Sequence, residues 1–249
     1  PPPLPLFLGS FTPRPRLRAL RATFFHTCPG LPAEGHVSSA ADIALMSREL
    51  ILKHPDIRTY TTIWMDTLRD GAFGLTNTNK LVRFYDGATG LKTGSTDGAL
   101  FCVSATAEKE GMELIAVVLG SPTSADRFET AKALLNYGFA GWTLVTAAPS
   151  EPLIPVPVSL GTAPSVQPVL AEECRLLLPK AQAGTVTTTL TVADTLAAPV
   201  EQGQQIGTLT VLVDGASRQT IPLLAQEAVP RLTLWQVYQA TLTKLFCGA

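Results

Sequence analysis

The sequence predicts an α+β protein built from two domains and a C-terminal helix. In the first half, residues 101–107 and 112–120 read as two strands separated by the charged turn Glu108-Lys109-Glu110-Gly111, and a helical pattern follows them. After Trp142 the sequence changes to short apolar or threonine-rich runs separated by proline and glycine, which is typical of an all-β domain. With 249 residues, 46% of them hydrophobic, the chain can bury a core in each domain.

Residues 1–22 combine proline and arginine and show neither helical nor strand periodicity. We expect this arm to be disordered, or to be sequence foreign to the domain that follows. The first domain is then expected to cover residues 23–145.

A surface helix is predicted from about residue 39 to Lys53. Ser39 is a suitable N-cap, and Asp42 stands at the capping-box position three residues later. Three apolar residues at helical spacing form the buried face: Ile43, Met46 and Leu50. Farther along, Asn77 and Asn79 are interpreted as loop residues whose side chains bond the backbone.

A second helix is predicted after the two strands. Thr123 and Asp126 resemble a capping box, and the helix is expected to end at Gly138. Its apolar face is expected to contain four residues: Phe128, Ala131, Leu134 and Leu135.

The second domain is expected at residues 150–230, after a proline-rich linker around residues 148–155. Its predicted strands are residues 166–170, 175–178, 185–192, 205–213 and 219–224. Their number and spacing favour a small β-sandwich.

Residues 232–249 are predicted to form an amphipathic helix. Its apolar face includes Trp235, Tyr238, Leu242 and Phe246. Two interpretations stay open: packing against the β-domain, or peripheral contact with a membrane surface.

Composition excludes several classes of function. A net charge of −1 gives no basic surface for nucleic acid. The four cysteines and three histidines form no metal-binding motif, so neither a metal nor another cofactor is predicted. Cys102 lies in a strand pattern and is interpreted as a small buried hydrophobe. We find no membrane-spanning run and no signal peptide.

The chain is organised around the box Leu91-Lys92-Thr93-Gly94-Ser95-Thr96, which opens the strand-rich region. Lys92 supplies a cation, the Thr93 hydroxyl can donate to an anionic substrate, and Gly94 lets a substrate backbone approach the strand. The text KTGSTDGALFCVSATAEKEGMELIAVVLGSPTSADRFETAKALLNYGF, with GLPAEGHVSSAADIALMSREL and TNTNKL upstream, closely resembles the D-alanyl-D-alanine carboxypeptidases, the low-molecular-mass penicillin-binding proteins. The resemblance fails before about Thr23.

This resemblance implies a fold and an activity. Residues 23–145 would be the C-terminal part of a penicillin-binding, β-lactamase-like α/β domain, and a β-domain and terminal helix would follow. The family removes the terminal D-alanine of peptidoglycan stem peptides through an acyl-serine, and β-lactams bind the same site. The implied location is the cell envelope, on the extracytoplasmic face of the membrane. The strand ending near Gly120 would be flanked by strands from a preceding part of the chain, so its outer edge is expected to be open here or covered by the arm.

The resemblance also assigns roles to individual residues. Lys92, Thr93 and Gly94 match the catalytic box, and the Ser95 backbone N–H matches an oxyanion donor. Thr96 and Arg127 match substrate-binding positions, with Arg127 near the substrate carboxylate. For Arg127 the alternative of an ordinary surface charge in the first turn of a helix stays open.

The nucleophile and its base are missing from the sequence. No serine is followed by lysine at the third position, and none has asparagine two residues on. We therefore expect this chain to be an inactive, N-terminally incomplete fragment of the enzyme. The alternative is a non-catalytic cell-envelope or peptidoglycan-binding module.

Overall fold

The computed structural model describes residues 20–27 and 30–247. The chain divides between Gly141 and Trp142 into two compact units, each described below by itself. Both units combine the predicted element types, so the α+β prediction is confirmed.

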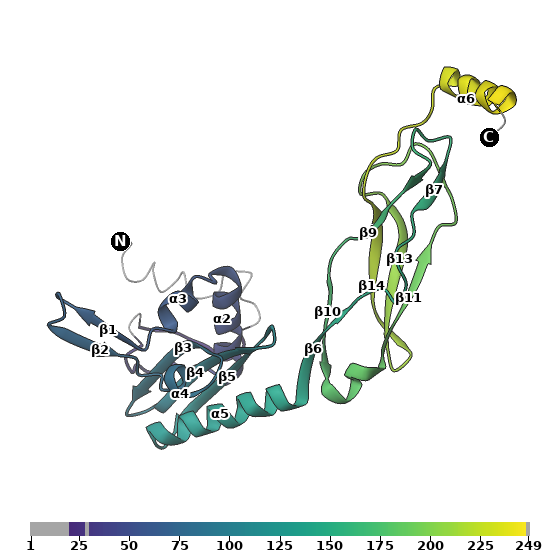
Figure 1. Ribbon diagram of the computed structural model, residues 1–249. Helices are drawn as coiled ribbons and strands as arrows, with labels where there is room; N and C mark the ends of the chain where they lie inside the picture. The colour runs from purple at the N-terminus through teal and green to yellow at the C-terminus, as the bar shows by residue number, and fades with distance from the viewer. Residues whose placement is uncertain (1–19, 28–29, 248–249) are drawn as a thin grey trace. The chain divides into compact units, whose positions relative to one another are not determined.

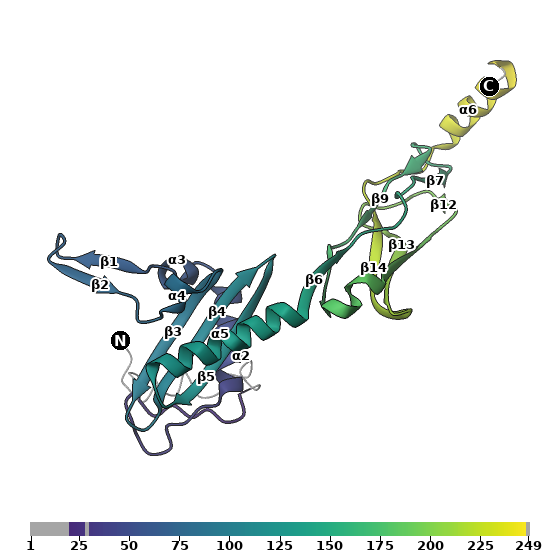
Figure 2. The same cartoon turned by 60° about the horizontal axis from the view of Figure 1, so that its bottom comes forward.

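The first unit is built on a three-stranded antiparallel sheet. Its strands are β3 (Ala88–Thr96), β4 (Leu100–Lys109) and β5 (Met112–Ser121), in the order β3-β4-β5. Helix α2 (Ala40–Lys53) covers one face of the sheet and α5 (Ser124–Gly141) covers the other (Figures 1 and 2). The main core lies between α5 and the sheet, where Val103, Ala105, Ala116, Phe128 and Leu135 are buried together.

Helix α5 extends three residues beyond its predicted end. A Cβ atom at Gly138 would lie 2.5 Å from Cδ1 of Leu114. Gly138 therefore allows the helix to pack closely on β5, and it does not terminate the helix. The predicted capping box is present, because the backbone N–H of Asp126 donates to Thr123 Oγ1 over 3.1 Å.

Helix α2 begins as predicted, but the N-terminal arm is shorter than the predicted residues 1–22. Ser39 Oγ accepts from the backbone N–H of Asp42 at 3.1 Å. The Asp42 carboxylate accepts from the backbone N–H groups of Arg21 and Ala22 and from the Thr23 hydroxyl. Residues 21 and 22 therefore belong to the domain, and the predicted boundary at residue 22 is too late. Most of the arm lies outside the described residues.

Between α2 and the box lie α3 (Ile57–Thr61), the hairpin β1 (Met65–Leu68) and β2 (Phe73–Thr76), and α4 (Leu81–Phe84). The interpretation of the two asparagines is confirmed. Asn77 Nδ2 donates to the carbonyls of Thr61 and Ile63, and Asn79 Nδ2 donates to the carbonyl of Gly90. These bonds hold the loop after β2 against the box strand.

The second unit is the predicted β-domain. Its largest sheet has the order β11-β13-β14-β9. These strands are β9 (Pro168–Leu170), β11 (Val186–Val192), β13 (Gln205–Val213) and β14 (Ala216–Ala225). A second sheet has the order β12-β7-β8, formed by β7 (Val156–Ser159), β8 (Ser165–Val166) and β12 (Leu196–Ala197).

The boundary of the second unit differs from the prediction. Strand β6 (Trp142–Ala147) pairs with β10 (Cys174–Pro179), which leads into the short helix η2 (Lys180–Thr185). Ala147 and Cys174 are buried together with Leu209 of the main sheet. Residues 142–145 therefore belong to the second unit, and the proline-rich segment 148–155 connects two strands inside it.

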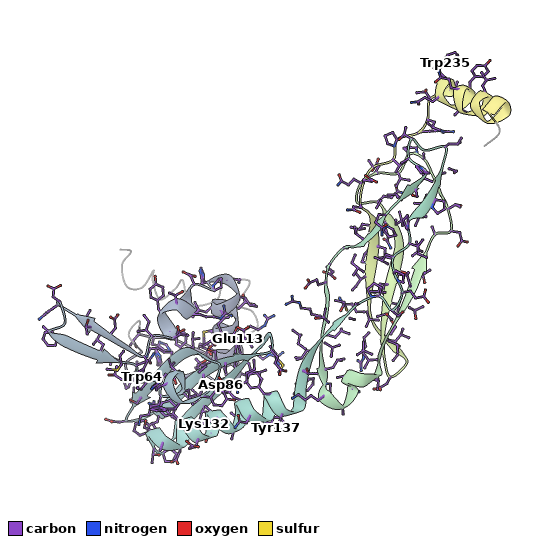
Figure 3. The ribbon with its side chains drawn as sticks, in the orientation of Figure 1. Trp64, Asp86, Glu113, Lys132, Tyr137 and Trp235 are labelled. Atoms are coloured by element: carbon purple, nitrogen blue, oxygen red, sulfur yellow. The ribbon has the colours of Figure 1, made fainter. Side chains whose placement is uncertain are left out.

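The last element is helix α6 (Leu234–Cys247), close to the predicted bounds. Leu234, Trp235 and Tyr238 are 91%, 65% and 55% exposed. The Trp235 and Tyr238 rings stack at 5.6 Å, and Figure 3 shows Trp235 on this helix. The side chain of Phe246 lies outside the described residues.

Candidate active site

The box forms the last six residues of β3, an edge strand of the sheet. Lys92 lies opposite Ser104, and Gly94 lies opposite Cys102 on β4. The backbone N–H of Glu108 donates to the carbonyl of Gly87, so the even-numbered residues of β4 direct their backbone groups toward β3. Alternation then directs the backbone groups of Gly94 into the sheet and the N–H of Ser95 away from β4.

The Thr93 side chain is 8% exposed and has a fixed partner. Its Oγ1 lies 2.6 Å from Oγ1 of Thr78, in the loop that Asn77 and Asn79 hold. Sequence reasoning missed Thr78. Its position between two loop asparagines was the available signal, but only the fold brings it to the box strand.

Lys92 is exposed, and its Nζ donates to the carbonyl of Thr93 at 2.5 Å. Within the described part of the chain, Lys92 forms no ion pair with a carboxylate. An exposed ammonium without a carboxylate partner can turn toward an incoming anion at small cost. Gly94 and Ser95 are also exposed, whereas Thr96 is half-buried.

Arg127 is not the surface charge that the open alternative described. It is 6% exposed, and Nη1 donates to the carbonyls of Gly94 and Cys102 at 3.2 and 3.1 Å. Nη2 donates to the Ser124 hydroxyl, and the guanidinium lies over the Phe128 ring at 4.6 Å. Burial lowers the pKa of Arg127 from its usual value, yet Nε has no partner in the described structure.

A groove of about 330 Å³ runs beside the box. Its floor includes Lys92, Thr93 and Gly94, and Ile43 and Met46 of α2 form its apolar wall. A neighbouring groove of about 630 Å³ continues past Ser95 and Thr96 toward Gly98. Lys92, Thr93, Gly94, Ser95 and Thr96 therefore border these two neighbouring grooves, whereas Arg127 lines neither of them.

The Cys102 side chain is less buried than the sequence indicated. It is half-buried, lines both grooves, and places Sγ 3.3 Å from the carbonyl of Ala99. The interpretation of Cys102 as a small buried hydrophobe is therefore wrong in its burial, because the groove leaves this part of β4 uncovered.

The two serines near Lys92 are engaged with each other. Ser47 Oγ and Ser104 Oγ lie 2.8 Å apart, and both residues are buried. A serine nucleophile needs a nearby base and access to substrate. The described arrangement offers a cation, hydroxyl donors and an open backbone N–H, which suit carboxylate and carbonyl recognition.

Comparison with known proteins agrees with this geometry. Residues 17–123 match the family model described as D-alanyl-D-alanine carboxypeptidase. Residues 150–231 match the model for the penicillin-binding protein 5 C-terminal domain. The first match begins before Thr23, so the resemblance extends farther toward the N-terminus than expected.

Curated relatives cover most of this chain. D-alanyl-D-alanine carboxypeptidase DacF of Bacillus subtilis is 33% identical over 89% of this chain and 58% of its own length. DacC of Escherichia coli is 30% identical over 90% of this chain and 56% of its own length. The chain thus spans little more than half the length of these relatives.

Solved structures give the same result. Penicillin-binding protein 5 from Haemophilus influenzae superposes with a TM-score of 0.62 and 26% identity, covering 91% of this chain and 64% of that structure. Penicillin-binding protein 6B from Escherichia coli gives a TM-score of 0.59 and 27% identity, covering 84% and 56%.

An α/β unit with a Lys-Thr-Gly edge strand, followed by a β-sandwich unit, defines the class of low-molecular-mass penicillin-binding proteins. Within that class, the chain belongs to the D-alanyl-D-alanine carboxypeptidase family, whose members act in cell-wall metabolism.

Proposed function

We propose that this chain forms the Lys-Thr-Gly side of a D-alanyl-D-alanine carboxypeptidase site and that, as given, it does not carry out acyl transfer. The observation that supports the proposal is the box strand: Lys92 borders one open groove, Ser95 with its outward N–H borders the neighbouring one, and no Ser-x-x-Lys motif occurs in the sequence. Removing a nucleophile and its base typically leaves about 10³- to 10⁴-fold rate enhancement over water, and this remaining enhancement needs an intact oxyanion hole.

In this proposal each box residue recognises part of a peptide that ends in D-Ala-D-Ala. The Thr93 hydroxyl, oriented by Thr78, donates to the terminal carboxylate, and Lys92 adds positive charge. Ser95 N–H donates to the carbonyl of the penultimate residue. Thr96 borders the leaving side of the groove.

The role of Arg127 is narrower than the sequence implied. Three of the five N–H groups of Arg127 already donate within the protein, and Nε, which has no partner among the described residues, is buried. We propose that Arg127 assists carboxylate binding mainly through its charge and by holding the carbonyl of Gly94.

Two assays test the proposal. Incubation with a fluorescent penicillin, followed by a denaturing gel and intact mass, is expected to show no adduct; a stoichiometric adduct that Lys92→Ala abolishes would overturn the claim of inactivity. NMR titration with a peptide ending in D-Ala-D-Ala is expected to shift amides of residues 92–96 at millimolar concentration. Thr93→Val should remove these shifts, and a peptide ending in L-Ala-L-Ala is the control.

We also propose that α6 contacts the envelope membrane from its extracytoplasmic side. The support is the exposed apolar face formed by Leu234, Trp235 and Tyr238. In the described residues no helix is long and apolar enough to cross a bilayer. Trp235 fluorescence should shift to the blue with anionic liposomes, and deletion of residues 232–249 should abolish co-sedimentation; an unchanged spectrum contradicts the proposal.

The second candidate function is a non-catalytic cell-envelope or peptidoglycan-binding module. The missing Ser-x-x-Lys motif favours it as much as it favours an inactive part of the carboxypeptidase. Sedimentation with purified peptidoglycan distinguishes the two. Binding that survives Thr93→Val and resides in residues 142–249 supports the module, whereas loss of binding in Thr93→Val supports the box.

A further inference from the structure

The end of the second unit from which α6 leaves, here called the tip, consists of three neighbouring segments: residues 159–164, 196–200 and 229–233. We propose that the tip rests on the same anionic lipid bilayer as α6, with Leu160 inserted among the lipids and Arg231 at the headgroups. This inference rests on the membrane contact proposed above for α6, and it extends that contact to the β-domain. Figures 1 and 2 show β7 and α6 at one end of the unit and β6 at the other.

Backbone hydrogen bonds place the turn between β7 and β8 directly beside the start of α6. The N–H of Leu232 donates to the carbonyl of Leu160 at 2.8 Å. The N–H of Thr162 donates to the carbonyl of Pro230 at 2.9 Å. These two bonds fix the turn against the last residues that precede α6, so the turn and the beginning of the helix hold a constant position relative to each other.

The first turn of α6 is fixed by a capping box. The N–H of Gln236 donates to Thr233 Oγ1 at 3.3 Å, and the N–H of Thr233 donates to Gln236 Oε1 at 2.8 Å. At most about 7 Å of chain separates Leu232 from Leu234, the first residue of the helix. An interfacial helix buries its apolar face about 5 to 10 Å into the boundary between headgroups and acyl chains. A bilayer that takes up α6 therefore also reaches the turn that holds Leu160.

Leu160 combines two unfavourable features. Its φ angle is 56°, in the left-handed region that glycine and asparagine favour, and its side chain is 49% exposed. Glycine or asparagine at this position would relieve the backbone strain and would expose no apolar side chain. Strain that is kept at an exposed position indicates a contact outside the folded chain. Insertion of the leucine side chain into lipid is such a contact, because it removes apolar surface from water.

The charge of the tip suits an anionic surface. Arg231 is the one charged residue in its three segments. It is exposed, and it forms no ion pair with any residue that the structure describes. The acidic residues Glu201 and Glu227 lie past the bridge that pairs residues 200 and 229, on the side away from α6. The tip thus presents an apolar side chain and an unpaired cation together, and a basic residue at this level is attracted by anionic lipids.

The first test measures co-sedimentation of the full chain with vesicles of phosphatidylcholine mixed with phosphatidylglycerol. Leu160→Asn should lower the partition coefficient about tenfold without lowering the melting midpoint, because asparagine suits the left-handed backbone. The matched control Leu177→Asn, at a position 52% exposed on β10, should change the partition coefficient less than about twofold. Arg231→Gln should weaken binding to these vesicles about fivefold and leave binding to pure phosphatidylcholine vesicles unchanged. Arg218→Gln, at an exposed position on β14, is its control.

A depth measurement separates the contact of the tip from that of α6. Lipids brominated in their acyl chains should quench the added emission of Leu160→Trp and not that of Leu177→Trp. If wild-type emission is quenched, Trp235→Phe removes that quenching and the indole of Leu160→Trp escapes it, then α6 binds the membrane alone; this result overturns the inference and leaves the proposed contact of α6 standing. Equal partition coefficients of Leu160→Asn and wild type also overturn the inference alone. A wild-type chain that binds neither kind of vesicle overturns both.

Discussion

Substitutions at Arg127 test whether this buried guanidinium stabilises the box strand through its charge or through its shape. The side chain makes hydrogen bonds to the carbonyls of Gly94 and Cys102 and to the Ser124 hydroxyl. The two carbonyls belong to register partners on β3 and β4, so they retain strand partners when Arg127 is lost. Removing the guanidinium therefore leaves few orphaned acceptors.

The two informative variants are Arg127→Met and Arg127→Lys. Methionine loses three hydrogen bonds, roughly 1 kcal/mol each, but it also removes the cost of burying a charge, so we expect a net loss of about 1 to 2 kcal/mol. Lysine keeps a buried charge and cannot reproduce the forked donors, so we expect a loss of about 3 to 4 kcal/mol. The lysine variant should thus be the less stable of the two.

Urea unfolding followed by hydrogen exchange of peptides from residues 88–121 measures this order, because it separates the first unit from the second. Equal stability of Arg127→Met and wild type would mean that the charge contributes nothing. A lysine variant more stable than the methionine variant would refute the reasoning, since it would show that charge matters more than the donor geometry.

Three further changes test other parts of the fold. Asp42→Asn should lower the urea midpoint at pH 7 and lose its effect as pH falls below about 4. Hydrogen bonds from Thr23 and the neighbouring backbone lower the pKa of Asp42, so the carboxylate stabilises the fold above its unfolded pKa and stops doing so as pH falls through the folded pKa. Equal differences in midpoint between variant and wild type at pH 7 and pH 2.5 would contradict this. Residues 142–249 should fold alone. Residues 150–249 lack β6 and should be roughly 3 to 6 kcal/mol less stable, because β10 loses its partner strand. Equal melting midpoints of the two fragments in calorimetry would contradict this expectation. Gly207→Ala should cost about 2 kcal/mol in the same assay, because a Cβ atom would lie 2.6 Å from the carbonyl oxygen of Thr191, and a neutral change would show that the strand shifts freely.

Local patterns in the sequence predicted the elements that local chemistry determines. Ser39 and Asp42 form a cap within four residues, and the structure confirms it. Strand β13 matches its predicted residues 205–213 for the same reason, since alternation is a property of neighbours along the chain. Gly138 misled the prediction because its role depends on contact with Leu114 of another element.

The site shows the same distinction. The box could be read directly because Lys92, Thr93 and Gly94 are adjacent in sequence. The burial of Arg127 could not, because it requires α5 to cross the sheet beneath Cys102 and Gly94. The Thr78 partner of Thr93 likewise depends on a loop folding back over fifteen residues of chain.

The box strand is held from several directions, and this bears on what survives without a nucleophile. Thr61 fixes the carbonyl of Thr89, Asn79 fixes that of Gly90, Thr78 holds Thr93, and Arg127 binds the carbonyl of Gly94. All four contacts come from residues that this chain contains, on α3, the loop after β2, and α5. The geometry that recognises a carboxylate is therefore encoded independently of the group that attacks a carbonyl. It follows that loss of acyl transfer and loss of peptide recognition should be separable, and a chain without Ser-x-x-Lys can still present an ordered recognition strand.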